Sequence, residues 1–297
     1  MKMNNYDDIF NSAPAAGKDP EFSKEEFAAR KKAEREDLYL LSDSTALEVA
    51  GDSGRFRQYL DVHSRFDRYS AVNSLLILAQ KPEAVRLGSF DHWKEKGGSI
   101  KTGQTGFSIL EPQEYTKDDG SLGVGFNTKR VFDISQIDAK KIKAEPVPPT
   151  YSDRQLLTAL VAKAPVKISS VDDLPANIAA ITSPETGEIT VRRGMAFTDT
   201  FRSVAQELAS AQMNSGPESR IDSGFSAYCA SYILCKKYGV DTQDFDFSGA
   251  PEVMDGMDAQ EVKAELSKIH NAISEITGRI TRNLDSMQKA ARDQEAR

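Results

Sequence analysis

The chain has few of the residues that bind transition metals, cross-link a fold or cross a membrane. Its 297 residues include 3 His, 2 Cys and 1 Trp. Both cysteines, Cys229 and Cys235, fall in one predicted helix, where six residues at about 1.5 Å each separate their Cα atoms by about 9 Å, too far for a disulfide. No apolar run approaches the roughly 20 residues that a spanning helix needs, and the N-terminus lacks the apolar core of a secretory signal. The sequence therefore predicts reduced, buried thiols in a cytoplasmic protein without a membrane anchor.

The chain also lacks the basic excess that is typical of nucleic-acid-binding proteins. Its net charge is −7, which weighs against nucleic acid as a partner. The charge is unevenly distributed, however, because residues 54–110 carry 9 Lys/Arg against 5 Asp/Glu. This central part of the chain is the one plausible electrostatic footprint for phosphate. Since the excess is small, binding there would depend on arrangement and on base stacking.

Composition and turn signals predict an α+β fold of two domains followed by a helical extension. The predicted parts are a mobile polar arm at 1–37, a first domain of mixed helix and sheet at 38–143, a Pro-rich linker at 144–150, a second domain at 151–249 and a C-terminal helical extension at 250–297. The extension repeats apolar residues at helical steps, so we expect it to pack on the second domain. The oligomeric state has no signature in the sequence.

The second domain contains the most informative motif, Gln206-Glu207-Leu208-Ala209-Ser210. It lies in a predicted helix from Thr198 to Met213, whose apolar residues recur at helical spacing. A predicted hairpin precedes this helix, with strands at 179–182 and 188–191 joined by Pro184-Glu185-Thr186-Gly187. A hairpin followed by a helix with His-Glu-x-x-His is typical of zinc peptidases.

In such peptidases the two histidines share one helix face and bind the metal, while the glutamate activates a water molecule. Here Glu207 stands at the position of the catalytic base, but Gln206 and Ser210 stand where the histidines belong. A neutral amide and a hydroxyl are poor zinc ligands. The motif therefore predicts a metallopeptidase-like, zincin-like domain that binds no metal and uses no cofactor, with Glu207 as a vestigial residue.

The first domain carries a second, independent pattern. Asn73 lies on an apolar helix, and the segments Trp93–Gly98, Lys101–Gly106 and Val131–Gln136 follow in order. This order resembles the N-terminal single-stranded-DNA-binding domain of the ArdC antirestriction family. In that family the second domain is a zinc-metallopeptidase-like module, which is where the altered motif falls. The resemblance covers about residues 38–280.

The resemblance implies a third metal ligand, an acidic residue on the next helix. The matching position in this chain is at or near Tyr228, so all three ligand positions hold residues that bind zinc poorly. His63 and His92 have no second ligand spaced to join them, and His270 alone cannot replace three ligands. We therefore expect a pseudo-metallopeptidase that is not an enzyme and folds without zinc.

Ten residues of the first domain are candidates for contact with single-stranded DNA. Trp93 could stack on a base, but we favour the alternative that it is part of the core. Asn73 could read a base, but the alternative that it satisfies a backbone group fits its apolar helix better. The full set is Arg65, Arg68, Tyr69, Asn73, Trp93, Lys94, Lys96, Lys101, Lys129 and Arg130.

Three functions remain open. The first is a single-stranded-DNA-binding, antirestriction-like accessory protein of a plasmid, conjugative element or phage. The second is an interaction module whose pseudo-peptidase cleft holds a segment of another protein. The third, which we favour least, is an active peptidase that uses Glu207. The first two are compatible with each other.

Overall fold

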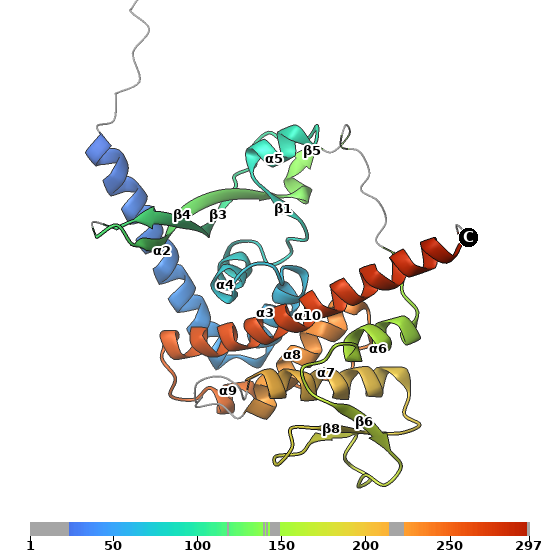
Figure 1. Cartoon of the computed structure of the whole chain (residues 1–297). Coiled ribbons are helices and arrows are strands. Elements are labelled where there is room, and N and C mark those ends of the chain that lie inside the picture. The colour runs from blue at the N-terminus through green and yellow to red at the C-terminus, as the bar shows by residue number, and fades with distance from the viewer. Residues whose placement is uncertain are drawn as a thin grey trace, which may run out of the picture.

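The computed structural model describes residues 24–117, 119–138, 140, 142, 149–213 and 223–295. Helices pack with small sheets, so the expected α+β class is confirmed (Figure 1). The elements, in chain order, are α2 (Lys24–Gly51), α3 (Ser53–Arg65), α4 (Ala71–Gln80), β1 (Leu87–Gly88), α5 (Phe90–Glu95), β2 (Ser99–Ile100), β3 (Phe107–Thr116), β4 (Leu122–Asp133), η1 (Ile134–Gln136), β5 (Ile137–Asp138), α6 (Asp153–Val161), β6 (Ile168–Val171), β7 (Ala180–Thr182), β8 (Ile189–Arg192), α7 (Phe197–Met213), α8 (Ser223–Tyr238), α9 (Ala250–Val253) and α10 (Ala259–Glu295). Most of the predicted linker at 144–150 lies outside the described residues.

The prediction of a mobile arm at 1–37 is wrong for residues 24–37, which form the first part of α2. Residues 1–23 lie outside the described part of the chain. The helix has no strong apolar face here and is supported instead by charge and by the sheet. Glu34 pairs with Arg30 at 3.3 Å and with Lys31 at 2.8 Å. Arg35 donates from Nη1 to the carbonyl of Phe126 on β4 at 3.2 Å, so a strand far along the chain holds the helix in place.

The main sheet of the first half has the order β1-β4-β3, with β3 and β4 forming a long hairpin. Helix α4 runs beside the free edge of β3 and supplies side-chain amides to it. Asn73 donates to the carbonyl of Leu110 at 2.7 Å and accepts from its N–H at 2.8 Å. Gln80 does the same for Ser108, at 2.9 and 3.1 Å. Pro112 takes the next outward position, where it has no N–H to leave unpaired.

The second half confirms the predicted hairpin and helix around the altered motif. Strands β7 and β8 pair antiparallel, with Thr182 opposite Ile189, and β6 pairs with β8 in parallel. Gly187 in the connecting turn has φ of 69°, a conformation that glycine adopts without strain. Helix α7 then packs on the sheet and along α8.

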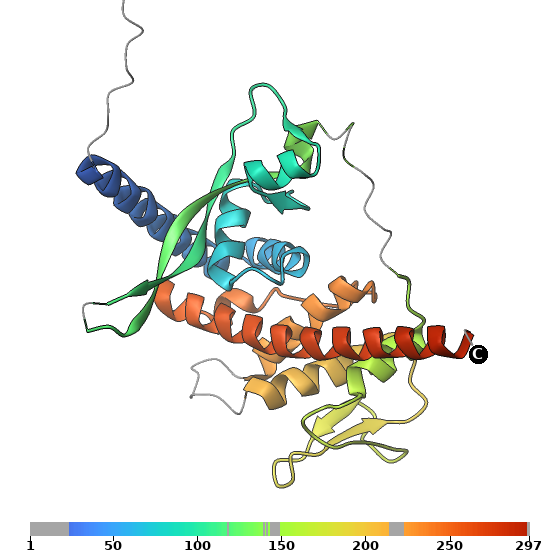
Figure 2. The same cartoon turned by 45° about the horizontal axis from the view of Figure 1, so that its top comes forward.

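The C-terminal helix α10 runs between the two halves, as Figures 1 and 2 show. It contacts α2 and α4 on one side and α6, α7 and α8 on the other. Ile269, Ile273 and Ile276 are buried in the same core cluster as residues of both halves. The extension therefore packs on the second domain as expected, and on the first domain as well. No helix in the described part of the chain is both long enough and apolar enough to cross a membrane.

Candidate functional sites

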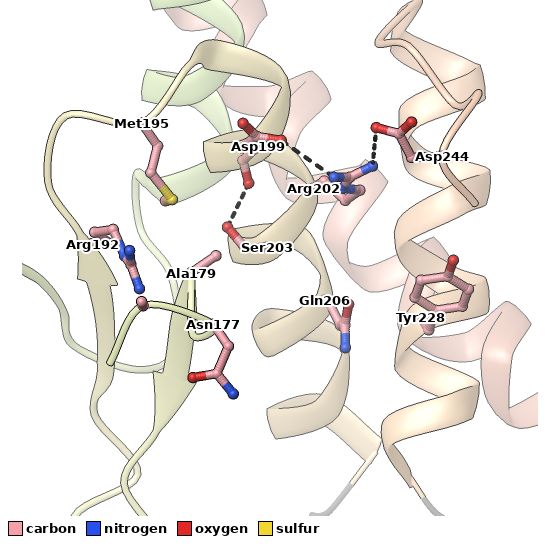
Figure 3. Close-up of a pocket in the computed structure, with 11 residues that line it drawn as sticks. Asn177, Ala179, Arg192, Met195, Asp199, Arg202, Ser203, Gln206, Tyr228 and Asp244 are labelled. Atoms are coloured by element: carbon pink, nitrogen blue, oxygen red, sulfur yellow. Dashed lines mark hydrogen bonds and ion pairs between the residues drawn. The ribbon is translucent and has the colours of Figure 1, made fainter. Parts of the chain in front are cut away.

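The altered peptidase motif lies in the middle of α7, against α8 and the β7–β8 hairpin. Leu208 and Ala209 of the motif are buried in the core, whereas Gln206, Glu207 and Ser210 are half-buried. Gln206 faces the space in front of Tyr228 on α8, and the two side chains line one pocket of about 420 Å³ (Figure 3). The structure therefore brings together two of the three predicted former ligand positions. The third, Ser210, lies one turn further along α7 and does not line the pocket.

Glu207, the residue at the catalytic-base position, is engaged with the neighbouring strand. The hydroxyl of Thr182 on β7 donates to its Oε2 at 2.5 Å. Such a charge-assisted hydrogen bond stabilises the carboxylate and occupies one of its oxygens. A general base needs a free lone pair directed at the proton that it removes. The contact with Thr182 therefore links α7 to β7 and engages one of the two oxygens that a general base could use.

Tyr228 is held by the segment that follows α8. Its hydroxyl oxygen accepts a hydrogen bond from the backbone N–H of Asp246 at 2.9 Å. Its ring packs against Phe245 and Phe247, with centroid distances of 4.8 and 5.5 Å. The hydroxyl is thus directed to the backbone and not to Gln206. The apolar contacts of the ring stabilise this wall of the pocket without an ion.

Charged residues that the sequence analysis missed surround the mouth of this pocket. Arg202 pairs with Asp199 at 3.3 Å and with Asp244 at 3.4 Å (Figure 3). Arg192 reaches the carbonyl of Ile178 at 2.7 Å and ties down the loop before β7. The one sequence signal for this cluster is the position of Arg202, one turn before Gln206 on the same helix face.

The donor set of the pocket does not fit a catalytic metal ion. Within the described ranges, no group of three or more His, Cys, Asp or Glu residues is placed to hold one. Gln206 offers an amide and Tyr228 a phenol already bound to the backbone, while the two carboxylates that line the pocket, Asp199 and Asp244, are both paired with Arg202. Zinc requires imidazole, thiolate or carboxylate ligands, and Mn²⁺ prefers carboxylates.

A second pocket, which we call the first-half groove, lies in front of the β1-β4-β3 sheet and has a volume of about 540 Å³. Its lining is Arg68, Tyr69, Ser70, Asn73, Leu87, Gly88, Ser89, His92, Ile109, Leu110, Glu111, Pro112, Phe126, Lys129, Val131 and His270. Four of the ten predicted DNA-binding candidates are among these residues. Tyr69 is half-buried, and burial raises the pKa of its hydroxyl. Lys129 pairs with Glu111 across the hairpin.

Three candidates have structural roles that account for their side chains. Trp93 is 1% exposed and donates from Nε1 to the carbonyl of Phe132 at 3.0 Å, so the favoured core interpretation is confirmed and the stacking role is wrong. Asn73 uses its amide on Leu110, which confirms the structural interpretation of that residue. Arg65 donates from Nε to the carbonyl of Ala84 at 3.0 Å.

The remaining candidates are exposed residues outside the first-half groove. Lys94 and Lys96 lie on and just after α5, and Arg130 lies on β4. Lys101 donates from Nζ to the carbonyl of Ser135 at 2.7 Å. The predicted basic cluster is therefore not one surface, and the groove contains only Arg68 and Lys129 of its basic members.

His270, to which the sequence analysis gave no role, reaches the groove from α10. Its Nδ1 lies 3.3 Å from Nε2 of His63, whose Nδ1 lies 2.7 Å from the hydroxyl of Ser74. His63 is fully buried, and this burial, together with His270, lowers its pKa to about 3. Burial also lowers the pKa of His270. No local pattern signals this pair, because 207 residues separate its members.

Comparison with known proteins finds one family model that matches part of the chain and solved structures that share its fold. Residues 49–143 match the family model of the N-terminal domain of the anti-restriction factor ArdC. The metal-free crystal structure of the antirestriction protein ArdC from the R388 plasmid aligns with a TM-score of 0.51 and 16% identity, over 72% of this chain and 86% of that one. Its Mn(II)-bound structure aligns with a TM-score of 0.50 and 15% identity, over 71% and 85%. Residues 49–143 are therefore an ArdC-type N-terminal domain, as the sequence predicted, and the chain shares the fold of the R388 protein.

One further relative is the uncharacterized protein pXO2-81 of Bacillus anthracis. It is 22% identical over 283 residues, which cover 76% of this chain and 48% of the relative. The chain thus spans about half the length of this relative.

Proposed function

We propose that this protein binds single-stranded DNA through the first-half groove and acts as an antirestriction accessory protein of a plasmid or another mobile element. The observation that carries the proposal is the groove itself, in which a tyrosine and two basic residues lie within the segment that matches the ArdC N-terminal domain. The R388 plasmid origin of the solved ArdC structures supports the biological setting.

The chemistry of the groove suits an unpaired strand. Tyr69 offers an aromatic ring, and stacking of one base on such a ring contributes about 1–3 kcal/mol. Arg68 and Lys129 supply positive charge for phosphates. Phe126 adds a second aromatic ring and is 42% exposed. The faces of unpaired bases are free to stack on these rings, whereas in a duplex they are stacked on neighbouring bases.

Equilibrium binding of a fluorescent oligothymidylate to the full chain tests this proposal. We expect Tyr69→Ala to weaken binding roughly 5- to 150-fold, which is the stacking energy expressed as an affinity. Lys129→Gln should reduce the slope of log affinity against log salt concentration by about one, which corresponds to one counterion fewer released on binding. The matched control is Lys101→Gln, which removes an exposed lysine outside the groove and should change little. Equal losses in all three variants, or no binding by the wild type, would contradict the proposal.

We further propose that the second half is a pseudo-metallopeptidase. Its support is the set Gln206, Ser210 and Tyr228 at the former ligand positions, together with the engagement of Glu207 by Thr182. The expected result is an unchanged melting temperature in the presence of a strong chelator, and no stabilisation by added Zn²⁺ or Mn²⁺. A ligand that binds only the folded state stabilises it by RT ln(1 + [L]/Kd), so a chelator-induced drop would refute this proposal.

A second candidate function for this half is the capture of a protein segment without cleavage. The pocket between α7 and α8 remains open at about 420 Å³, with Gln206 and Tyr228 on opposite walls. Pull-down by the full chain that is lost in Gln206→Lys, but retained in the exposed-site control Glu185→Lys, would support it. Cleavage of a partner that stops in Glu207→Gln would instead support an active peptidase.

A further inference from the structure

A second aromatic pocket lies next to the first-half groove, between α2 and the β3–β4 hairpin. It has a volume of about 510 Å³ and is lined by Arg35, Tyr39, Gln113, Tyr115, Val124, Gly125, Phe126 and Asn127. Phe126 lines both pockets, so they adjoin along the hairpin. Arg35 and Tyr39 precede residue 49, where the match to the ArdC N-terminal domain begins.

The ring of Tyr115 lies across two glycines of the opposite strand. A Cβ placed on Gly123 would approach Cζ of Tyr115 to 2.7 Å, and one on Gly125 would approach Cε1 to 3.4 Å. The absence of a side chain at Gly123 therefore lets the ring lie close to the backbone of β4, whereas a Cβ at Gly125 would make only an ordinary van der Waals contact with it. Tyr115 is nevertheless 51% exposed. One part of the ring is thus supported by the strand while the rest is open to solvent, which is the arrangement that a stacking platform needs.

The guanidinium of Arg35 lies at the wall of the same pocket. Arg35 is fixed at its wall by the hydrogen bond from Nη1 to the carbonyl of Phe126 at 3.2 Å. A guanidinium has five N–H donors, so further donors remain for a phosphate oxygen. The neighbouring Lys31 is already paired with Glu34 at 2.8 Å and adds little net charge.

We propose that this hairpin pocket is a second nucleobase-binding site, in which Tyr115 stacks on a base and Arg35 contacts the adjoining phosphate. A strand bound in the first-half groove would then continue along the hairpin. Glu111 in the groove and Tyr115 in the hairpin pocket are four residues apart on β3, which corresponds to about 14 Å. The inference rests on the proposed function of the first-half groove, and it assigns the part of the chain before residue 49 to the DNA-binding surface.

Length-dependent binding distinguishes the two sites. The full chain is titrated with labelled oligothymidylates of two and about 15 nucleotides; at roughly 3.4 Å per stacked nucleotide, the dinucleotide is too short to reach both sites. We expect Tyr115→Ala to weaken binding of the long oligonucleotide roughly 5- to 150-fold and to leave the short one unchanged. Tyr115→Phe, which keeps the ring, should bind both like the wild type.

Two further variants separate stacking from a general effect on the hairpin. Gly123→Ala introduces a Cβ where the Tyr115 ring lies, so it should reproduce the loss of Tyr115→Ala while the tyrosine is still present. The control is Leu122→Ala, at a residue that is 72% exposed on the same hairpin and does not line the pocket. Photo-cross-linking of the long oligonucleotide with iodouracil, followed by mass spectrometry, should locate the cross-link at Tyr115.

The outcomes for the two proposals differ. If Tyr69→Ala weakens both oligonucleotides and Tyr115→Ala weakens neither, the hairpin site is refuted and the first-half groove stands. A cross-link confined to the groove, or an equal loss in Leu122→Ala, would also refute the hairpin site. If the wild-type chain binds neither oligonucleotide, both proposals fail.

Discussion

The buried pair His63 and His270 makes the free energy of unfolding depend on pH below about pH 6.5. Both imidazoles have a pKa below the usual value of 6.5, and burial is the main cause for each. The folded chain therefore keeps His63 neutral down to about pH 3. The unfolded chain protonates the same residue near pH 6.5. Below that pH the unfolded state binds more protons, so we expect stability to be full above pH 6.5 and to fall as the pH decreases.

The size of the effect follows from proton linkage. A difference of one bound proton changes the free energy of unfolding by about 1.36 kcal/mol per pH unit. Between pH 6.5 and pH 5.0, His63 alone therefore lowers the free energy of unfolding by about 2 kcal/mol. With an unfolding entropy of about 2.1 cal/mol/K per residue, this corresponds to a decrease of about 3 °C in melting temperature. His270 acts in the same direction. Glu34 and Glu83 have pKa values below 4.5 because of lysine hydrogen bonds, so they titrate outside this window.

The assay is thermal or urea unfolding at closely spaced pH values from 7.5 to 5.0. His63→Asn removes the titrating group and should abolish most of the slope, although it also leaves a small cavity that lowers stability at every pH. His92→Gln is the matched control, because His92 lies on α5 outside the core, and its slope should equal that of the wild type. A His63→Asn variant that retains the wild-type slope would refute the reasoning.

Three further outcomes follow from side chains that the structure buries. Asn73→Ala leaves two backbone groups of β3 without partners and should lower the free energy of unfolding by about 2–4 kcal/mol. The control Asn127→Ala, at an exposed residue, should lower it by less than about 0.5 kcal/mol, and equal values for the two variants in urea titration would contradict this prediction. Burial raises the pKa of Cys235 to about 12 and that of Cys229 well above its usual value, so a thiol reagent should modify neither before denaturation, and fast labelling of the native chain would be inconsistent with their placement. Trp93 fluorescence should resist quenching by acrylamide and by bound oligonucleotide; quenching by DNA would show that the ring is accessible after all.

Local patterns were sufficient to predict several elements of the fold. The β7–β8 hairpin and the helix after it have turn residues and apolar spacing that specify them within a short window. The first part of α2 could not be predicted in this way. Its interaction with Phe126 on β4 spans 91 residues, so the helix appears as an exposed charged segment when the sequence is considered alone.

The same limit applies to the candidate sites. The position of Tyr228 near Gln206 was predictable, because the resemblance to the ArdC family implies a ligand position at or near residue 228. The burial of Trp93 was also favoured from the sequence, but the hydrogen bonds of Trp93 and Arg65 were not predictable, since their partners are backbone carbonyls that only the folded chain brings near. An aromatic or basic residue shows its type in the sequence but not its degree of burial. His270 joins the groove from the opposite end of the chain, and no spacing rule indicates that contact.

If the second half is the pseudo-metallopeptidase that we propose, the packing of α10 gives a reason why this half would persist. Helices α7 and α8 pack against one side of α10, and the helices of the first half pack against the other. Glu207, at the predicted catalytic-base position, accepts a hydrogen bond from Thr182, and Tyr228, at a predicted ligand position, accepts one from the backbone N–H of Asp246. Such contacts stabilise the fold without an ion. Because α10 also carries His270 into the first-half groove, removing α6, α7 and α8 would expose the apolar face of the helix that completes this groove. Selection for DNA binding would then preserve the second half as a scaffold, whether or not its pocket holds a partner.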